Sequence, residues 1–268
     1  MPFPLLLSLF LLFVISIHVG SFLNVLIDRI PKGEGFVKGR SYCDHCKKRL
    51  RAFDLVPLFS FIFLRGKCRY CGQRISLYYP LVELLTALLF LLAIYSLPTA
   101  ANQLFVMSHL PSTLYYLFIV SCLITIFFTD LKYGIIPDKI VYPAILISFL
   151  FLILNSKFLI LNYLLSGLGA GLFFLILHVA TRGKGMGAGD VKLAFLMGFL
   201  LGAPLVIISL YLAFLTGAAV SLILILWRKK TRKDTISFGP FLTLGTYASL
   251  FWGKEILQIV SKILGLPL

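Results

Sequence analysis

Apolar residues occur along this chain in long blocks that are separated by short polar stretches. Most blocks have the length of about 17–25 residues that carries a helix across a bilayer. Because a helix satisfies its own backbone hydrogen bonds in lipid, the pattern predicts an all-α polytopic membrane protein with about eight transmembrane helices. We expect these spans at residues 4–27, 77–97, 112–131, 140–155, 158–180, 191–203, 204–227 and 237–252.

The composition agrees with this interpretation. Hydrophobic residues make up 60% of the chain and charged residues 13%. Soluble domains are about 45–50% apolar and about 25% charged. Apolar content this high has to be in contact with lipid or with other apolar helices.

The net charge of +15 would suit a nucleic-acid-binding protein, but its distribution follows the topology. If the N-terminus lies outside, only three of the 25 Lys and Arg residues fall on the outer side, at Lys157, Lys254 and Lys262. The others fall on the cytoplasmic side, five of them in the run at 228–233. This bias is the positive-inside rule, and it explains the charge without nucleic acid.

One sizeable polar segment, residues 28–76, interrupts the apolar pattern and contains two Cys-x-x-Cys pairs. We therefore divide the chain into a first transmembrane helix at 1–27, a cytoplasmic mini-domain at 28–76 and a transmembrane domain at 77–268. A segment of about fifty residues usually needs a disulfide or a bound metal ion to fold stably. Its apolar stretch at 55–64 is too short to span and forms either the mini-domain core or a segment lying on the membrane.

The cysteine pairs have the spacing of a structural zinc site. They are separated by 21 residues, close to the usual four-cysteine pattern. Basic neighbours favour thiolates, and a reducing cytoplasm disfavours the alternative of disulfide or redox chemistry. A fourth sulfur closes the coordination sphere, so the metal would be structural. The predicted ligands are Cys43, Cys46, Cys68 and Cys71, with His45 an alternative ligand inside the first pair.

Two polar residues lie within expected spans. Asn24 can form a helix–helix hydrogen bond or contact a substrate. Glu83 is an intramembrane acid, which indicates function by default, but it can also be an interfacial residue paired with Arg or Lys.

Two aspartates fall where apolar runs meet the cytoplasm. Asp190 ends a Gly-x-Gly-Asp sequence, and Asp130 ends another apolar run sixty residues earlier. Gly187 and Gly189 lack a Cβ and tolerate positive φ, so an extended substrate backbone can lie beside the acid. Two acids within a few ångströms share one proton, and such a pair can activate water for peptide hydrolysis.

The alternative is that each aspartate is a separate interface residue, capped or paired with Lys132 or Lys192. Asp138 follows Pro137 at a helix start, where we expect it to act as a cap. The sequence contains no serine-nucleophile elbow and no paired-histidine zinc motif that would supply another catalytic set.

These residues resemble the type IV prepilin peptidases, a family of GxGD-type intramembrane aspartyl proteases. Besides the two aspartate motifs, five shorter motifs fall in the family's order, at 20–25, 29–31, 41–46, 65–71 and 80–84. The similarity extends from about Gly20 to Trp227. Any one motif is modest, but together they are specific.

The resemblance implies that Asp130 and Asp190 are the catalytic pair of a bacterial inner-membrane enzyme. Such enzymes cut the leader from prepilins, or from pseudopilins of type II secretion, at the cytoplasmic face. Members with the four-cysteine insertion also methylate the new N-terminus with S-adenosylmethionine, and Gly66 matches a position linked to methyl transfer. Asp138 matches a family acid that is not assigned to cutting.

Two other classes of function compete with this one. A proton-coupled transporter would use Glu83, Asp130 and Asp190 as a relay, although it would need related halves that the sequence lacks. A zinc-containing membrane scaffold would recruit a partner without chemistry.

Overall fold

The computed structural model describes residues 3–36, 39–96, 110–155, 160–227 and 236–265. The chain forms two compact units, Met1–Thr125 and Ile126–Leu268. Within the described residues both units are helical, and the only β-type pairings are two isolated bridges in the mini-domain. The basic run at 228–233 lies outside the described residues.

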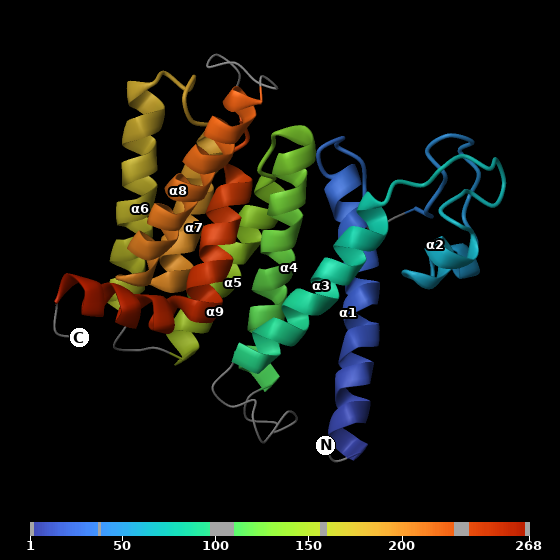
Figure 1. Ribbon diagram of the computed structural model, residues 1–268, viewed down its shortest axis with the longest axis horizontal. Helices are drawn as coiled ribbons and strands as arrows, with labels where there is room; N and C mark the ends of the chain where they lie inside the picture. Colours follow the sequence, from blue (N-terminus) through green and yellow to red (C-terminus); the bar gives the residue numbers. More distant parts are fainter. Residues whose placement is uncertain (1–2, 37–38, 97–109, 156–159, 228–235, 266–268) are drawn as a thin grey trace. The chain divides into compact units, whose positions relative to one another are not determined.

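In the first unit, helices α1 (Phe3–Arg29) and α3 (Tyr78–Ser96) lie side by side (Figure 1). Gly20 permits this contact, because a Cβ there would lie 2.7 Å from the Cα of Glu83. Asn24 of α1 donates a hydrogen bond to the backbone oxygen of Tyr79 at 3.1 Å. The helix–helix interpretation of Asn24 is therefore confirmed.

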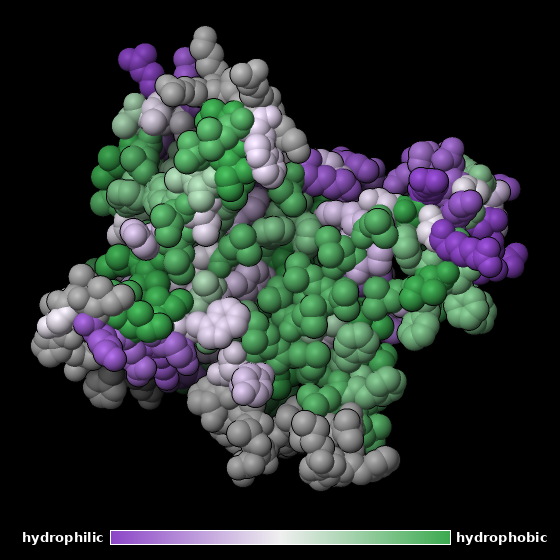
Figure 2. Space-filling view, viewed as in Figure 1, coloured by the Kyte–Doolittle hydropathy of each residue, from purple (hydrophilic) through white to green (hydrophobic). Residues whose placement is uncertain are grey.

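The mini-domain connects these helices and contains the 3-10 helix η1 (Ala52–Leu55) and the short helix α2 (Phe59–Phe63). No residue of α2 is buried, and Phe59, Ile62 and Phe63 are exposed. The expectation that this apolar stretch forms a core is wrong for these side chains. Figure 2 shows hydrophilic side chains gathered over much of the mini-domain, whereas apolar surface covers the long helices.

The second unit contains the end of α4 (Leu110–Tyr133) and five further helices. They are α5 (Asp138–Asn155), α6 (Ile160–Ala180), α7 (Ala188–Leu201), α8 (Leu205–Leu226) and α9 (Gly239–Leu264). Helix α7 contacts α5, α6, α8 and α9, and most of its residues are buried. With 14 residues, α7 is about 21 Å long, shorter than the hydrocarbon layer of about 30 Å.

Glycines bring α6 and α7 into close contact. A Cβ on Gly167 would lie 3.1 Å from the oxygen of Phe195, and one on Gly171 would lie 3.3 Å from the Cβ of Phe195. On α7, the other helix of this pair, a Cβ on Gly198 would approach the backbone of Ser166 and lie 2.7 Å from the Cα of Gly167. The small residues of this region therefore allow close helix approach.

Each of the eight expected spans corresponds to a helix, and the all-α membrane fold is confirmed. Six described helices are long and apolar enough to cross a membrane: α1, α3, α4, α5, α6 and α8. The other two are the short helix α7 and α9, whose backbone is non-helical at Trp252. Figure 1 shows α9 turning at this point. The three-part division at residues 27 and 76 stays a prediction.

We predict that Gly198→Ala destabilises the protein by about 1–3 kcal/mol, the usual cost of overpacking, because its Cβ would overlap the α6 backbone. Gly169→Ala in α6 is the matched control, since nothing lies within 4 Å of the new methyl group. That control should be neutral or stabilising by up to about 1 kcal/mol, because alanine is the better helix former. Thermal unfolding in detergent measures both, and equal stability of the two variants would contradict the packing argument.

Candidate active site and metal centre

Asp130 lies near the end of α4 and is only 4% exposed. Its Oδ2 accepts a hydrogen bond from the backbone N–H of Gly239 at 2.9 Å. Gly239 is the first residue of α9, where a helix has N–H groups without intrahelical partners. A Cβ on Gly239 would lie 2.6 Å from Oδ2 of Asp130, so only glycine fits between the carboxylate and the helix.

Stacked aromatic rings fix the position of Gly239. The ring of the preceding residue, Phe238, lies 6.3 Å from that of Phe174 in α6 and 5.1 Å from that of Phe214 in α8, centroid to centroid. Gly217 makes room for it, because a Cβ there would lie 3.1 Å from the Phe238 ring. The apolar interior of the unit therefore places a backbone donor at Asp130.

Asp190 lies in the first turn of α7 and is 8% exposed. Its Oδ2 accepts a hydrogen bond from the N–H of Gly187 at 3.0 Å, and its own N–H donates to the oxygen of Gly187 at 3.2 Å. An acid at this position also has a favourable interaction with the helix dipole. The second acid, like the first, is thus held by a backbone donor at the start of a helix.

The two acids lie in the same region of the second unit. Ile136 lies beside a glycine next to each acid, because its side chain would be 2.9 Å from a Cβ on Gly189 and 3.2 Å from one on Gly239. Burial raises the pKa of Asp190 to about 6, the hydrogen bond from Gly187 opposes this rise, and the charge of Asp130 adds to it. Asp130 is therefore close enough to influence the ionisation of Asp190.

The glycines of the Gly-x-Gly-Asp sequence have a different local role from the one expected. Gly187 has φ −74°, and Gly189 also lies outside the positive-φ region, so neither is needed for a left-handed backbone. Gly189 is required because Ile136 fills the space of its missing Cβ. Around Gly187, the atoms within 4 Å of a Cβ are Oδ2 of Asp190 and the nitrogen of Gly189.

Lys192 does not pair with either central acid. Its Nζ lies 2.7 Å from Oδ1 of Asp138 and 5.3 Å from the centre of the Tyr142 ring. The alternative in which Lys192 pairs with one of the two central acids is thus wrong. Asp138 is the first residue of α5, and its ion pair with Lys192 links α5 to α7.

The four predicted metal ligands form one cluster in the mini-domain. The sulfur atoms of Cys43, Cys46, Cys68 and Cys71 all lie within 4.8 Å of one another. Those of Cys43 and Cys71, from different pairs, are 3.9 Å apart. These residues can therefore hold a metal ion, and no residue other than cysteine takes part in the cluster.

The two cysteine pairs have the same backbone structure. In the first pair the N–H of Lys47 donates to Cys43 O at 2.8 Å, and in the second the N–H of Gly72 donates to Cys68 O at 3.0 Å. Isolated bridges, Tyr42 with Arg49 and Lys67 with Arg74, close the two turns. Lys47 and Gly72 also share a positive φ, of 56° and 69°. Two equivalent turns thus present their sulfurs to one centre.

Glu83 and Gly66 both have structural partners in the mini-domain. Glu83 is 7% exposed, and its Oε2 accepts a hydrogen bond from the N–H of Leu58 at 2.8 Å. Leu58 has a φ of 60°, an unusual conformation that this bond helps to hold. The partner of Glu83 is thus a backbone N–H and not the Arg or Lys that the interfacial interpretation expected. Gly66 has a φ of 66°, and a Cβ there would lie 3.0 Å from the Phe61 ring.

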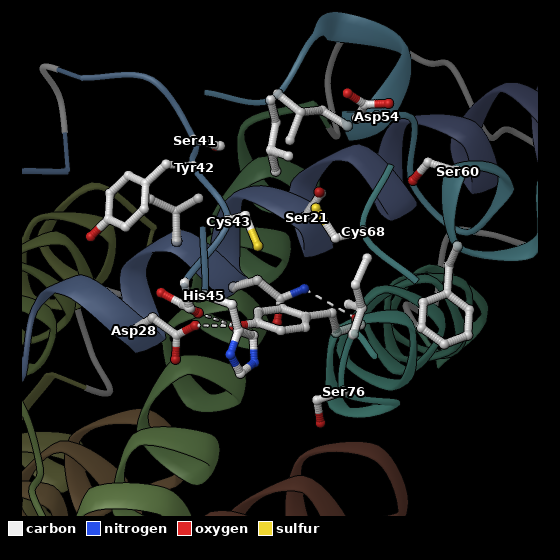
Figure 3. A pocket seen from close by; sticks show the side chains of 18 of the residues that line it. Ser21, Asp28, Ser41, Tyr42, Cys43, His45, Asp54, Ser60, Cys68 and Ser76 are labelled. Atoms are coloured by element: carbon white, nitrogen blue, oxygen red, sulfur yellow. Dashed lines mark hydrogen bonds between the residues drawn. The ribbon is translucent and has the colours of Figure 1, made fainter. Parts of the chain in front are cut away.

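A cavity of about 370 Å³ lies in the first unit, between the mini-domain, the end of α1 and the start of α3. Asn24 and Glu83 line it, and so do Cys43 and Cys68 of the cysteine cluster. Figure 3 shows Asp28, His45, Cys43 and Cys68 among the side chains that line this cavity.

Sequence reasoning missed two contributors to the acid pair. Gly239 appeared only as the start of an apolar run, although a glycine followed by proline at a helix start is a recognisable signal. His178 had no identifiable partner in the sequence. In the structure its Nδ1 lies 2.7 Å from the oxygen of Met186, and its charge acts on Asp190.

Comparisons with known proteins agree with this arrangement. Residues 14–97 match the bacterial peptidase A24 N-terminal domain, and residues 117–222 match the type IV leader peptidase family. A prepilin leader peptidase/N-methyltransferase of Aeromonas hydrophila is 34% identical, over 92% of this chain and 91% of its own. One from Bacillus subtilis is 30% identical, over 94% and 98%. No solved structure matched. The chain belongs to the type IV leader peptidase family.

We predict that Gly239→Ala impairs the acid pair without preventing membrane insertion. The new methyl group would displace the Asp130 carboxylate from its donor, and losing a hydrogen bond to a charged group costs about 1.5–3 kcal/mol. Proteolytic activity should fall by about tenfold or more, since 1.4 kcal/mol corresponds to a factor of ten. Gly35→Ala is the control, because nothing lies within 4 Å of its Cβ. Full activity of Gly239→Ala would contradict this account of Asp130.

Proposed function

We propose that this protein is a membrane-embedded leader peptidase that also methylates the N-terminus it creates. Its substrates would be prepilins or type II secretion pseudopilins. The observation that carries the peptidase proposal is the burial of Asp130 and Asp190 in one unit, each bound to a backbone N–H, with the charge of Asp130 acting on Asp190.

The chemistry proposed for the pair is that of an aspartyl protease. One carboxyl holds a proton and the other is ionised, because two adjacent carboxylates do not ionise together readily. The ionised carboxylate takes a proton from water, and the water oxygen bonds to the scissile carbonyl carbon. The protonated carboxyl donates its proton to the developing oxyanion. When the C–N bond breaks, the leaving nitrogen takes a proton from the pair while a hydroxyl of the gem-diol gives its proton to the pair, which is then again singly protonated.

Open space beside Asp190 supports a place for the substrate. Since a Cβ on Gly187 would meet only Asp190 and the backbone of Gly189, an extended peptide can approach this side of the acid. Gly187 is therefore the open part of the proposed substrate loop, and Gly189, whose missing Cβ makes room for Ile136, is its second glycine. Asn24 and Glu83, which the sequence also offered as substrate contacts, belong to the other unit and organise the mini-domain cavity.

We assign the cysteine cluster to a structural zinc ion and methyl transfer to S-adenosylmethionine. The cluster fits zinc, because four thiolates from two equivalent turns complete a tetrahedral site and leave no position for water. Bound there, zinc would supply folding energy to the mini-domain. S-adenosylmethionine, when bound, supplies the methyl group, and Gly66 is the residue that resemblance links to this activity.

The protein would reside in the bacterial inner membrane with its acid pair facing the cytoplasm. The six apolar helices and the basic bias of the segments between them support this orientation. Its partners would be the lipid bilayer and the prepilin or pseudopilin substrates, without nucleic acid. Nothing in the comparisons supports the alternative of a proton-coupled transporter.

We predict that Asp130→Asn and Asp190→Asn each abolish leader cleavage, because an amide can neither accept the proton from water nor share one with its partner. Each variant, co-expressed with a prepilin, should leave the leader attached, as measured by the mass of the product's N-terminus. Asp138→Asn is the matched control: it should lose only an exposed ion pair, worth about 0–1 kcal/mol, and keep cleavage. Normal processing by either central variant would show that the assigned pair is wrong.

We further predict that purified protein contains about one zinc ion per chain, held by the four cysteines. Cys43→Ser with Cys46→Ser should remove the metal and the added methyl group while leader cleavage survives in part. Metal analysis and product mass measure the two effects. Cys122→Ala, which changes the fifth cysteine inside α4, should keep metal and both activities. Retention of zinc by the double variant would contradict the assignment, and a complete loss of all activities would favour the scaffold alternative.

A further inference from the structure

Helix α2 turns an apolar face away from the mini-domain. Its side chains Phe59, Ile62 and Phe63 are 59%, 70% and 85% exposed. Their spacing of i, i+3 and i+4 places them on one face of the helix, here called the α2 face. On the other side of α2, Ser60 and Phe61 line the mini-domain cavity. Exposed apolar patches of this kind mark surfaces that contact a partner or a membrane.

We propose that the α2 face lies in the bilayer, at the leaflet from which α3 starts, and that lipids with anionic headgroups cover it. In the orientation proposed above this is the cytoplasmic leaflet, and the inference rests on that orientation only for the identity of the leaflet. Helix α2 would then be an interfacial anchor, which buries one apolar face at the boundary between headgroups and acyl chains without crossing the membrane.

A hydrogen bond fixes the level of α2 along the membrane helices. The N–H of Leu58, the residue before α2, donates to Oε2 of Glu83 at 2.8 Å. Glu83 lies beyond Tyr78, the first residue of the membrane helix α3, by about 7 Å along the helix axis at 1.5 Å per residue. Helical side chains lean toward the N-terminus, so this carboxylate reaches back toward the first turn of α3. Helix α2 is therefore tied to α3 where the membrane span begins.

The surface of α3 near this level is also apolar. Leu77, Leu81 and Leu84 are all exposed, and on a membrane helix such side chains are in contact with lipid or another helix. Figure 1 shows α2 at the lower edge of the mini-domain, toward the middle of the long helices. Figure 2 shows hydrophobic side chains along this lower edge and hydrophilic ones above it. The α2 face thus points in the direction in which α1 and α3 cross the bilayer.

Basic residues border the α2 face and favour an anionic surface. Arg51 precedes η1, Arg65 and Lys67 follow α2, and all three are exposed. Asp54 is the one acid in the sequence between positions 51 and 67, and it is bound to Arg69 at 2.6 Å. Anionic headgroups attract Lys and Arg that lie close to the membrane surface. An apolar face with a basic border therefore fits an anionic bilayer.

Lipid on one face of α2 would hold the cavity wall on the other. Phe61 packs against Gly66, where a Cβ would lie 3.0 Å from the ring, and Ser60 and Leu64 line the cavity with it. The mini-domain would thus be attached to the bilayer through α2, in addition to its connections to α1 and α3. A change at the α2 face would reach the cavity through this short helix, without contact with the cysteine cluster.

Tryptophan fluorescence in vesicles of phosphatidylcholine and phosphatidylglycerol tests the proposal on the full-length protein. The two native tryptophans, Trp227 and Trp252, are changed to phenylalanine, and Phe63→Trp supplies the reporter. Bromine near the carbonyl end of the acyl chains should quench its emission about twofold or more, because an interfacial helix buries its apolar face about 5–10 Å deep. Bromine near the methyl end should quench it less. Arg49→Trp, at an exposed position of the first cysteine turn, is the control and should be quenched little.

Further variants of the reporter protein test each part of the argument. Phe59→Ser with Ile62→Ser should reduce the quenching to that of the control, whereas Ser60→Ala on the other side of α2 should leave it unchanged. Omission of phosphatidylglycerol should weaken the quenching, and Arg65→Gln with Lys67→Gln should abolish this dependence on anionic lipid. Circular dichroism and thermal unfolding in detergent confirm that each variant is folded.

Equal quenching at positions 63 and 49 would overturn the proposal. Emission that responds to added prepilin or to the protein-to-lipid ratio, but not to bromine, would overturn it in favour of a substrate or a second copy on the α2 face. Quenching that does not depend on phosphatidylglycerol would overturn the preference for anionic lipid. Leader cleavage is measured in the same vesicles: its absence alongside strong quenching would contradict the proposed function and leave the contact with lipid in place.

Discussion

Backbone N–H groups at the starts of two helices hold the buried carboxylates of Asp130 and Asp190 in the second unit. The donor for Asp130 comes from Gly239, the first residue of α9, and that for Asp190 comes from Gly187, just before α7. Helix starts are suited to this, because their N–H groups lack partners and their dipoles favour negative charge. Two buried acids are tolerated in an apolar interior because each has a fixed donor that costs no side-chain entropy.

The packing around the acids also keeps backbone N–H groups next to the two carboxylates. Ile136 fills the space that glycine leaves at positions 189 and 239, and the Phe238 ring is held by Phe174 and Phe214. Small and large residues are thus matched so that backbone N–H groups reach both carboxylates. The first unit uses another solution, in which a cluster of four thiols organises a mini-domain too small to form a core of its own.

Much of this could be predicted from the sequence, because the strongest signals are local. The apolar blocks predicted the helices. The cysteine spacing predicted the cysteine cluster, because two short turns determine where the sulfur atoms point. The contact of Asp130 with Gly239 could not be predicted, because it joins residues 109 positions apart through the packing of α9. The partner of Lys192 could not be predicted for the same reason, because its ion pair with Asp138 depends on how α5 packs on α7. Of the two alternatives for the apolar stretch that contains α2, the exposure of α2 excludes a buried core for these side chains.

The position of Gly239 near the end of the chain has a consequence for biogenesis. A ribosome that has translated everything through α8 has produced both aspartates, yet Asp130 still lacks its hydrogen-bond donor. The hydrogen bond to Asp130 can therefore form only after α9 has been synthesised and has packed on the rest of the second unit. Packing of α9 is thus the step that gives the buried Asp130 carboxylate its backbone donor.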